Sequence, residues 1–302
     1  MTVCIGLIPN KQTSMLMQDS EVTYSGVALH QDIASKVHKV SENAVVGIIG
    51  DPHPALEMLE LLEENPVTNP RDLCTRLEDV YHTVRGRKFD LGILRKHGFS
   101  NIREVLSPQV DSDFRKTILA ALDNRDAFVV NLMLAYHFGS PGLYHINYPG
   151  IGSLENQVKM YQVDGSGSLS AADIVGNALT RYRWQPELTL SEAVLTMIDA
   201  GIASEKHTGV QRPFRISYVS REVPEHETEP QSVVCGLDTK MLNMIIHAQP
   251  YARQENVLQD AVARLLKATK GQATQEETVE LADYLKSKIK LGVEFDEYFG
   301  IA

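Results

Sequence analysis

Thr2-Val3-Cys4-Ile5-Gly6-Leu7-Ile8 opens the chain, followed by Pro9-Asn10-Lys11-Gln12 and then by Thr13-Ser14-Met15-Leu16-Met17. Two apolar runs separated by a short segment with proline and asparagine predict a β-hairpin. This pairing would bring Asp19, just past the second strand, to the level of Thr2. We therefore expect Thr2 and Asp19 to lie at the same end of the hairpin.

Composition indicates an ordinary soluble globular protein. The 302 residues are 43% hydrophobic and 23% charged, and the net charge is −10. No basic cluster offsets this charge, which argues against a nucleic-acid partner, and no apolar run has the length of a membrane span. Cys4, Cys74 and Cys235 lack metal-type spacing, so we expect reduced thiols in a cytoplasmic protein, with neither metal nor cofactor.

Periodicity places further elements along the chain. Strands are expected at 36–40, 44–49, 127–135, 143–148 and 214–219, the last of them closing the sheet. Helices are expected at 52–64, 171–181, 190–205, 254–267 and 274–290, and another should open at Asn69-Pro70. Thr189 with Glu192, and Thr274 with Glu277, have the spacing of capping boxes.

These elements predict an α+β protein in two parts. The main domain is expected at 1–220, with an insertion at about 85–124 in which Gly86, Gly92 and Gly98 interrupt charged and apolar clusters. A Glu- and Pro-rich crossing follows Ser220. A helical C-terminal extension is expected at 233–302, and it contains no concentration of reactive side chains.

Thr2 is the first candidate for chemistry. It lies directly behind Met1, and a small side chain at this position permits removal of the initiator methionine. A free N-terminal threonine carries its own base, because its α-amino group titrates near neutrality and can take the hydroxyl proton. Many proteins begin with Met-Thr, so this reading depends on a supporting site elsewhere in the chain.

Several segments support such a site by their order. They are Thr2-Val3-Cys4-Ile5-Gly6, Met17-Gln18-Asp19-Ser20-Glu21-Val22-Thr23, Ser35-Lys36-Val37-His38-Lys39-Val40, Ile48-Ile49-Gly50 and Asp164-Gly165-Ser166-Gly167-Ser168. Together they resemble the β-type proteasome subunits of the N-terminal-nucleophile (Ntn) hydrolases, including bacterial or archaeal-like homologues, over about residues 2–220. The resemblance implies a four-layer αββα sandwich, carrying here a helical insertion and a helical C-terminal extension.

The resemblance also assigns catalytic roles. Thr2 would attack a carbonyl carbon, and its α-amine would accept the proton. Lys36 would place a positive charge beside Thr2 and lower the pKa values of its hydroxyl and amine, while Asp19 would hold that lysine. Gly50 would supply the backbone N–H of an oxyanion hole. On spacing alone, Lys36 with Asp19 reads equally well as an ordinary ion pair, and Gly50 as a turn glycine.

Further positions carry over with departures from the family pattern. Ser166 would orient the terminal amine, and Glu205 and Thr208 would stand where the family has an aspartate and a serine. The substrate is expected to meet Thr23, Ile48 and Pro52, with Thr23 presenting its backbone to an extended peptide. Pro52 replaces a small residue, so the adjoining specificity pocket is expected to be reshaped.

The function implied is that of a threonine endopeptidase acting on peptides or unfolded proteins, assembled into a homo-oligomeric ring. Whether an ATPase partner serves the ring stays open. The same nucleophile also suits an Ntn transpeptidase or an amidase. A third reading is a structural ring subunit that keeps the fold without activity.

Overall fold

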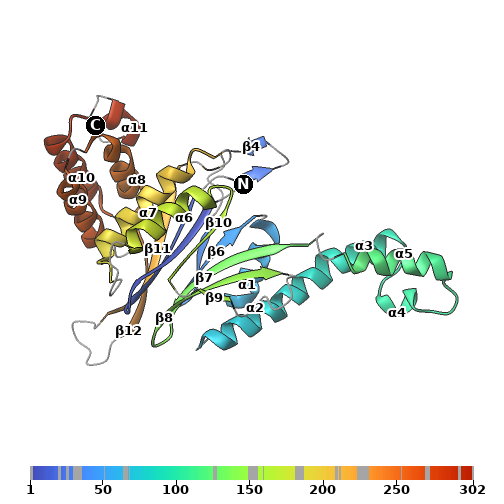
Figure 1. Ribbon diagram of the computed structural model, residues 1–302. Coiled ribbons are helices and arrows are strands. Elements are labelled where there is room, and N and C mark those ends of the chain that lie inside the picture. Colours follow the sequence, from blue (N-terminus) through green and yellow to red (C-terminus); the bar gives the residue numbers. More distant parts are fainter. Residues whose placement is uncertain are drawn as a thin grey trace.

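The computed structural model describes residues 3–19, 22–24, 27–29, 36–50, 52–63, 67, 69–124, 128–148, 156–158, 160–180, 187–207, 210, 212–222, 231–252, 254–268, 273–291 and 294–300. Within these residues the protein is a mixed α+β structure with two five-stranded antiparallel sheets (Figure 1). A separate short hairpin pairs β3 (Val22–Tyr24) with β4 (Val27–Leu29).

The first sheet is built around the predicted hairpin. Its strand order is β10 (Tyr161–Gly165), β1 (Val3–Asn10), β2 (Thr13–Asp19), β11 (Phe214–Glu222) and β12 (Gln231–Gly236). β1 and β2 pair with Cys4 opposite Gln18, which confirms the hairpin. Every residue of β2 is buried, because both faces of this strand are covered, and the apolar residues at its centre, Met15-Leu16-Met17, are consecutive rather than alternating.

The second sheet contains the strands expected in the middle of the chain. Its order is β5 (Val37–Ser41), β6 (Ala44–Ile49), β7 (Val130–His137), β8 (Pro141–Tyr148) and β9 (Asn156–Val158). β6 is buried along its whole length, as β2 is. The predicted strands at 36–40, 44–49, 127–135 and 143–148 are confirmed, with boundary shifts of a few residues.

Three apolar clusters hold the sheets and helices together. One lies between the two sheets and includes Cys4, Leu16 and Met133. The second joins the other face of the second sheet to α1 (Pro52–Glu63) and α2 (Pro70–Arg85). The largest joins the first sheet to the remaining body helices: α6 (Ser168–Thr180), α7 (Leu190–Ser204), α8 (Thr239–Ala248), α9 (Glu255–Ala268), α10 (Gln275–Lys288) and α11 (Glu294–Phe299).

Local sequence signals account for several helix boundaries. Asn69 caps α2, its side chain accepting the Asp72 amide, and Pro70 follows at the first helical position. Both predicted capping boxes are present, Thr189 with Glu192 on α7 and Thr274 with Glu277 on α10. A short 3-10 turn, η3 (Gln249–Tyr251), ends α8.

The strand predicted at 214–219 is confirmed as β11, but its expected place as the final strand was wrong. β12 pairs with β11 and forms the edge of the first sheet, with Tyr218 opposite Cys235. The run Val233-Val234-Cys235 is only three residues long and follows a polar crossing, so periodicity could not identify it. α8 then packs into the same apolar cluster as β1 and α7, which connects the C-terminal helices directly to the first sheet.

The insertion is helical throughout most of its described length. α2 continues without a break into a π-helix, η1 (Gly86–Asp90), and then into α3 (Leu91–Lys96). The expectation that Gly86 and Gly92 interrupt this segment was therefore wrong. Gly98 does interrupt it, with a φ of 84°. α4 (Ile102–Val105) and α5 (Ser112–Leu122) return the chain toward the body. These helices project away from both sheets (Figure 1).

His137, at the end of β7, makes stability depend on pH. The side chain is 1% exposed, and burial lowers its pKa from the ordinary value of 6.5. In the unfolded chain His137 takes a proton as the pH falls through that value, whereas in the folded protein it stays neutral until a lower pH. The free energy of unfolding should therefore fall as the pH drops below 6.5.

The variant His137→Gln should remove this contribution. Urea unfolding midpoints measured at about pH 7.5 and about pH 5.5 should show a smaller loss on acidification in the variant than in the wild type. Equal losses in the two proteins would show that His137 does not contribute to the pH dependence.

Candidate functional site

One carboxylate joins the start of β1 to the start of β5. Asp19 Oδ1, at the end of β2, accepts a hydrogen bond from the Val3 amide at 3.0 Å. The same oxygen lies 3.4 Å from Lys36 Nζ. Asp19 and Lys36 are 1% and 7% exposed, so this is a buried ion pair. The lysine directly precedes β5, so the pair connects the two sheets.

A second set of contacts fixes the end of β6 beside this pair. The Ile48 amide donates to the Lys36 carbonyl at 2.9 Å, and Gln18 Nε2 donates to the Ile48 carbonyl at 2.7 Å. Ile48 itself is 1% exposed, with its backbone fully engaged. The residues flanking Asp19 and Lys36 are thus tied to the strand that leads to Gly50.

Gly50 lies just past β6 with its backbone open. Its φ is 90°, a conformation that glycine adopts without strain. Among the described residues, its chain neighbours aside, no atom lies within 4 Å of the position a Cβ would occupy. Pro52 begins α1 two residues later. Thr23 lies on β3, where it pairs with Ala28. The chain around Gly50 is therefore accessible to a ligand that approaches the backbone.

The Gly165-Ser166-Gly167-Ser168 turn lies at the same end of the first sheet. Val3 pairs with Gly165, which has a φ of 98°. A Cβ on Gly167 would stand 2.4 Å from Ser204 Cβ and 3.1 Å from Ser204 Cα, so the turn packs tightly against the end of α7. Ser166, between the two glycines, is half-buried. The turn is thus held between the first residue of β1 and the end of α7.

Glu205 is engaged by a neighbouring cation. Both of its carboxylate oxygens contact Arg212, Oε1 at 2.5 Å from Nε and Oε2 at 3.0 Å from Nη2. A planar guanidinium pairs with a carboxylate in this way, through two parallel bonds. His207 Nε2 lies 2.9 Å from Ser170 Oγ on the first turn of α6. The turn after α7 is therefore fixed on two sides.

Two of the sequence-based candidates, Thr2 and Thr208, lie outside the described residues. The structure brings Asp19 and Lys36 together, and the Ile48 amide donates a hydrogen bond to the Lys36 carbonyl. Ser166 lies on the turn that pairs with Val3. Glu205 directly follows Ser204, against which that turn packs.

The acidic groups near β1 affect a neighbouring thiol. Burial raises the pKa of Cys4, and the charges of Asp164 and Asp19 add to this effect. A thiol with a raised pKa is protonated at neutral pH and is a poor nucleophile. Asp164, in contrast, has its pKa lowered, chiefly by His145, whose Nε2 lies 2.7 Å from Asp164 Oδ2. Cys4 is therefore a core residue, as its alternation in the strand indicates.

Sequence reasoning missed Gln18, His145 and Arg212. Gln18 and His145 act between the two sheets, and such contacts have no local sequence signal. Arg212 follows Glu205 by seven residues beyond the end of α7, and no spacing rule for neighbouring side chains pairs residues that far apart there. None of the three could have been assigned without the fold.

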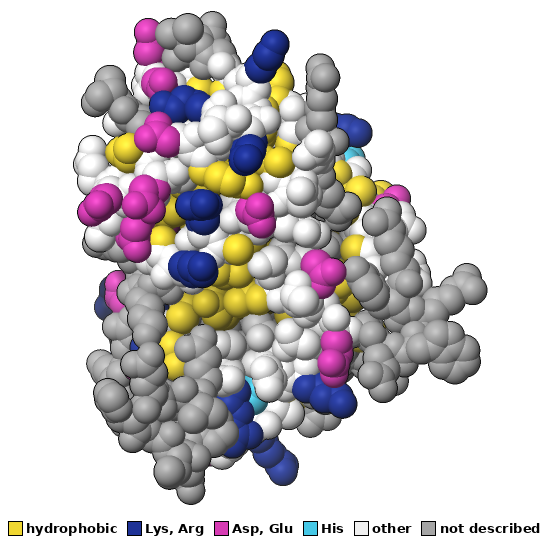
Figure 2. Space-filling view, turned by 90° about the vertical axis from the view of Figure 1, so that its left-hand side faces the viewer, with side chains coloured by type: hydrophobic (Ala, Val, Ile, Leu, Met, Phe, Trp, Pro, Cys, Tyr) yellow, Lys and Arg dark blue, Asp and Glu magenta, His cyan; other side chains and the backbone are white. Residues whose placement is uncertain are grey.

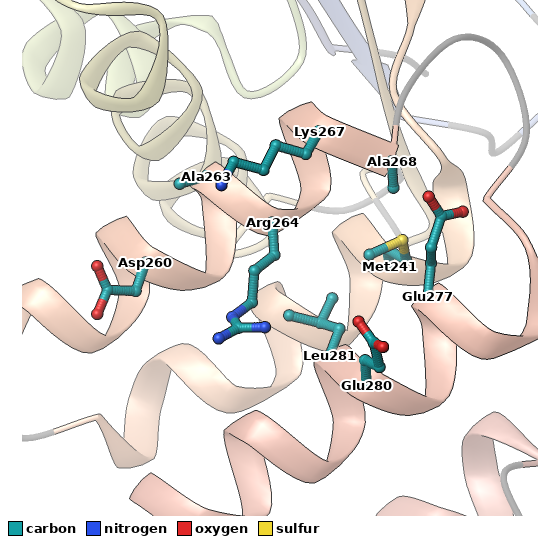
Figure 3. A pocket seen from close by; sticks show the side chains of 9 residues that line it. All are labelled: Met241, Asp260, Ala263, Arg264, Lys267, Ala268, Glu277, Glu280 and Leu281. Atoms are coloured by element: carbon teal, nitrogen blue, oxygen red, sulfur yellow. The ribbon is translucent and has the colours of Figure 1, made fainter.

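A hollow of about 540 Å³ lies far from this site, between α9 and α10. Figure 3 shows Arg264 and Lys267 on α9 and Glu277 and Glu280 on α10 around it. Arg264 also lies over the Tyr284 ring, 4.5 Å from its centroid. Asp260 on α9 lines the hollow as well, so acidic side chains come from both helices and neither charge is concentrated there.

The described residues contain neither a candidate metal site nor a candidate membrane-spanning helix. No group of three or more His, Cys, Asp or Glu side chains among them could hold a metal ion. In the same residues, no helix combines the length and the apolar character needed to cross a membrane.

No protein-family model matches the chain, and no curated protein matches it.

Proposed function

We propose that this protein is a proteasome-like threonine peptidase of the Ntn type, with Thr2 as nucleophile after removal of Met1. In this proposal the two sheets and the helices on their outer faces form a four-layer αββα sandwich. The three apolar clusters support this arrangement, since they lie between the sheets and on the outer face of each. The observation that carries the function is the shared oxygen of Asp19.

The shared oxygen limits the distance between Lys36 and the start of β1. Because the Val3 nitrogen and Lys36 Nζ both contact Asp19 Oδ1, their separation cannot exceed the sum of the two distances, about 6.4 Å. A peptide bond of about 1.3 Å joins the carbonyl carbon of Thr2 to that nitrogen. A buried ammonium group therefore lies within about 6.4 Å of the nitrogen that is bonded to Thr2, the proposed nucleophile.

The proposed reaction is acyl transfer in two steps. Thr2 Oγ bonds to the carbonyl carbon of the substrate, and its proton passes to the α-amine, directly or through a water. The C–N bond then breaks, and the leaving amine takes that proton. Water hydrolyses the resulting ester and restores the hydroxyl. Lys36 favours the deprotonated oxygen through its positive charge, and Gly50 N–H stabilises the oxyanion.

Glu205 has a positioning role in this proposal. Its carboxylate is already bound on both oxygens by Arg212. It therefore fixes the turn that follows Ser204, the residue against which Gly167 packs, and Ser166 and Thr208 orient the amine. Thr23 offers its backbone to an extended peptide, and Ile48 and Pro52 bound the neighbouring subsite. We further propose a cytoplasmic, ring-forming enzyme that acts on peptides or unfolded chains.

Covalent labelling tests the nucleophile. Intact mass should show the chain without Met1, and a peptide epoxyketone or β-lactone should add one equivalent to residue 2. Thr2→Ala should abolish this labelling without changing the native mass of the protein. Thr83→Ala, on the exposed face of α2, is the matched control and should label as the wild type does.

Retention of Met1 would exclude the peptidase and the transpeptidase alike, because the amine would be acylated. Labelling that persists in Thr2→Ala would place the nucleophile elsewhere. If the labelled protein transfers its acyl group to an added amine in preference to water, the activity is that of a transpeptidase.

A further inference from the structure

A second carboxylate, on the other side of β1 from Asp19, also joins the two sheets. Asp164 lies on β10 in the first sheet, and His145 lies on β8 in the second. Asp164 Oδ2 is 2.7 Å from His145 Nε2, and the two side chains are 32% and 20% exposed. β1 lies between β2 and β10, so each of its neighbours carries an acid that contacts a basic side chain on or directly before a strand of the second sheet.

The other oxygen of Asp164 holds the turn that carries Ser166. Asp164 Oδ1 accepts a hydrogen bond from the Gly165 amide at 2.6 Å. Gly165 has a φ of 98° and pairs with Val3. One carboxylate thus binds the beginning of this turn through one oxygen and contacts the second sheet through the other.

The strand pairings place this contact beside the first residues of β1. Cys4 pairs with Asp164, and His145 pairs with Met133 on β7. Cys4 Sγ and Met133 Sδ are 3.9 Å apart, in the apolar cluster between the sheets. The contact between Asp164 and His145 therefore lies where β1 packs on the second sheet, one residue beyond Val3.

The chemistry of this contact favours a geometric role over a large effect on stability. His145 is the main cause of a lowered pKa at Asp164, so Asp164 is ionised at neutral pH and accepts at both oxygens. A contact that is partly open to solvent contributes little to the free energy of unfolding. It does fix the direction of the carboxylate, which cannot rotate without leaving either the Gly165 amide or His145.

We propose that His145 and Asp164 form a positioning pair for Thr2, an inference that rests on the proposed function. Neither side chain of the pair contacts the substrate. The pair holds residues 165–168 and the start of β1 against the second sheet, as the buried ion pair does from the other side. Ser166, which orients the terminal amine in the proposed mechanism, thereby keeps its place beside Thr2.

Substitution of His145 tests the pair. His145→Leu should lower the maximal rate of covalent labelling at Thr2 by about tenfold and change the half-saturating inhibitor concentration by less than about twofold, because the proposed subsite is untouched. The urea unfolding midpoint should stay close to that of the wild type. His145→Gln places an amide N–H within reach of the Asp164 carboxylate, so it should restore most of the labelling rate. Equal losses in the two variants would overturn the inference.

A double-variant cycle determines whether His145 acts through Asp164. Asp164→Ala should slow labelling at least as much as His145→Leu does, because it frees both the turn and the contact with the second sheet. His145→Leu added to Asp164→Ala should then cause no further loss. Additive losses would mean that His145 acts through a different group, and the positioning pair would be wrong.

Hydrogen exchange measured by mass spectrometry gives a readout that does not depend on Thr2. In His145→Leu, peptides that cover the start of β1 and residues 165–168 should exchange about tenfold faster than in the wild type. Peptides that cover β11 should be unaffected. A wild type that does not label would contradict the proposed function, and exchange would still decide whether the pair holds β1. Unchanged exchange at β1 and the turn would overturn the inference.

An exposed ion pair on the C-terminal helices provides the matched control. Lys286 Nζ lies 3.2 Å from Asp283 and 3.1 Å from Asp296. Figure 2 views the molecule from the side of these helices, where acidic and basic side chains are interspersed. Lys286→Leu removes a basic partner of carboxylates, as His145→Leu does, and should leave labelling and exchange at β1 unchanged. If it slows labelling as much as His145→Leu, the effect is not specific to the pair and the inference fails.

Discussion

Lys36→Met should reduce the rate of covalent labelling at Thr2 by about 100-fold or more, since the positive charge beside the nucleophile is lost. It should also destabilise the protein. Asp19 is 1% exposed, and removing the ammonium group that lies 3.4 Å from its carboxylate costs about 3–5 kcal/mol. Labelling kinetics and urea unfolding would measure the two effects separately.

A double variant separates the chemistry from the stability. In Lys36→Met/Asp19→Asn the buried charge is gone, while the asparagine oxygen can still accept the hydrogen bond from the Val3 amide. Much of the lost stability should return, and labelling should stay low. If labelling recovers together with stability, Lys36 serves the fold alone and the proposed role of its charge is wrong.

Gly167→Ala should displace the turn that carries Ser166. The new methyl group would stand 2.4 Å from Ser204 Cβ and within 3.2 Å of two Ser204 backbone atoms, so α6 and α7 must separate. Such overpacking costs about 1–3 kcal/mol. Because Val3 pairs with the neighbouring Gly165, the shift should reach the start of β1 and slow labelling by about 10-fold or more.

Gly92→Ala is the matched control for this substitution. Gly92 lies within α3 in the helical insertion, and outside its own helix no atom of the described residues lies within 4 Å of its Cβ position. Alanine there should stabilise the protein by about 0.5–1 kcal/mol and leave labelling unchanged. Equal behaviour of the two alanine variants in unfolding and labelling would show that the turn at Gly167 is not tightly packed.

Much of the fold could be predicted because its signals are local. The opening hairpin, the two capping boxes and the glycine after Ile49 each depend on residues close together in sequence. β12 could not be predicted, since its three central apolar residues become a strand only through pairing with β11. α11 could not be predicted either, because six residues are too few to show a helical period. The packing of Phe295 and Phe299 in the largest apolar cluster holds this helix in place.

The site divides in the same way. The contact between Lys36 and Asp19 followed from order along the chain and from the family resemblance, and the structure contains it. The ion pair of Arg212 with Glu205 and the contact of His145 with Asp164 required the fold, because each joins segments whose approach no spacing rule describes. The sequence thus indicated that Asp19 and Lys36 would meet near the start of β1. The fold added Arg212 and His145, which contact Glu205 and Asp164.

The ion pair between the sheets has a consequence for when the protein can react. Asp19 belongs to the first sheet, and Lys36 leads into the second, so their contact exists only after the two sheets have docked. In the proposed mechanism, a nascent or partly folded chain carries Thr2 without the neighbouring charge. If Thr2 is the nucleophile, its reactivity begins with the final step of folding, and the newly made chain is protected from it until then.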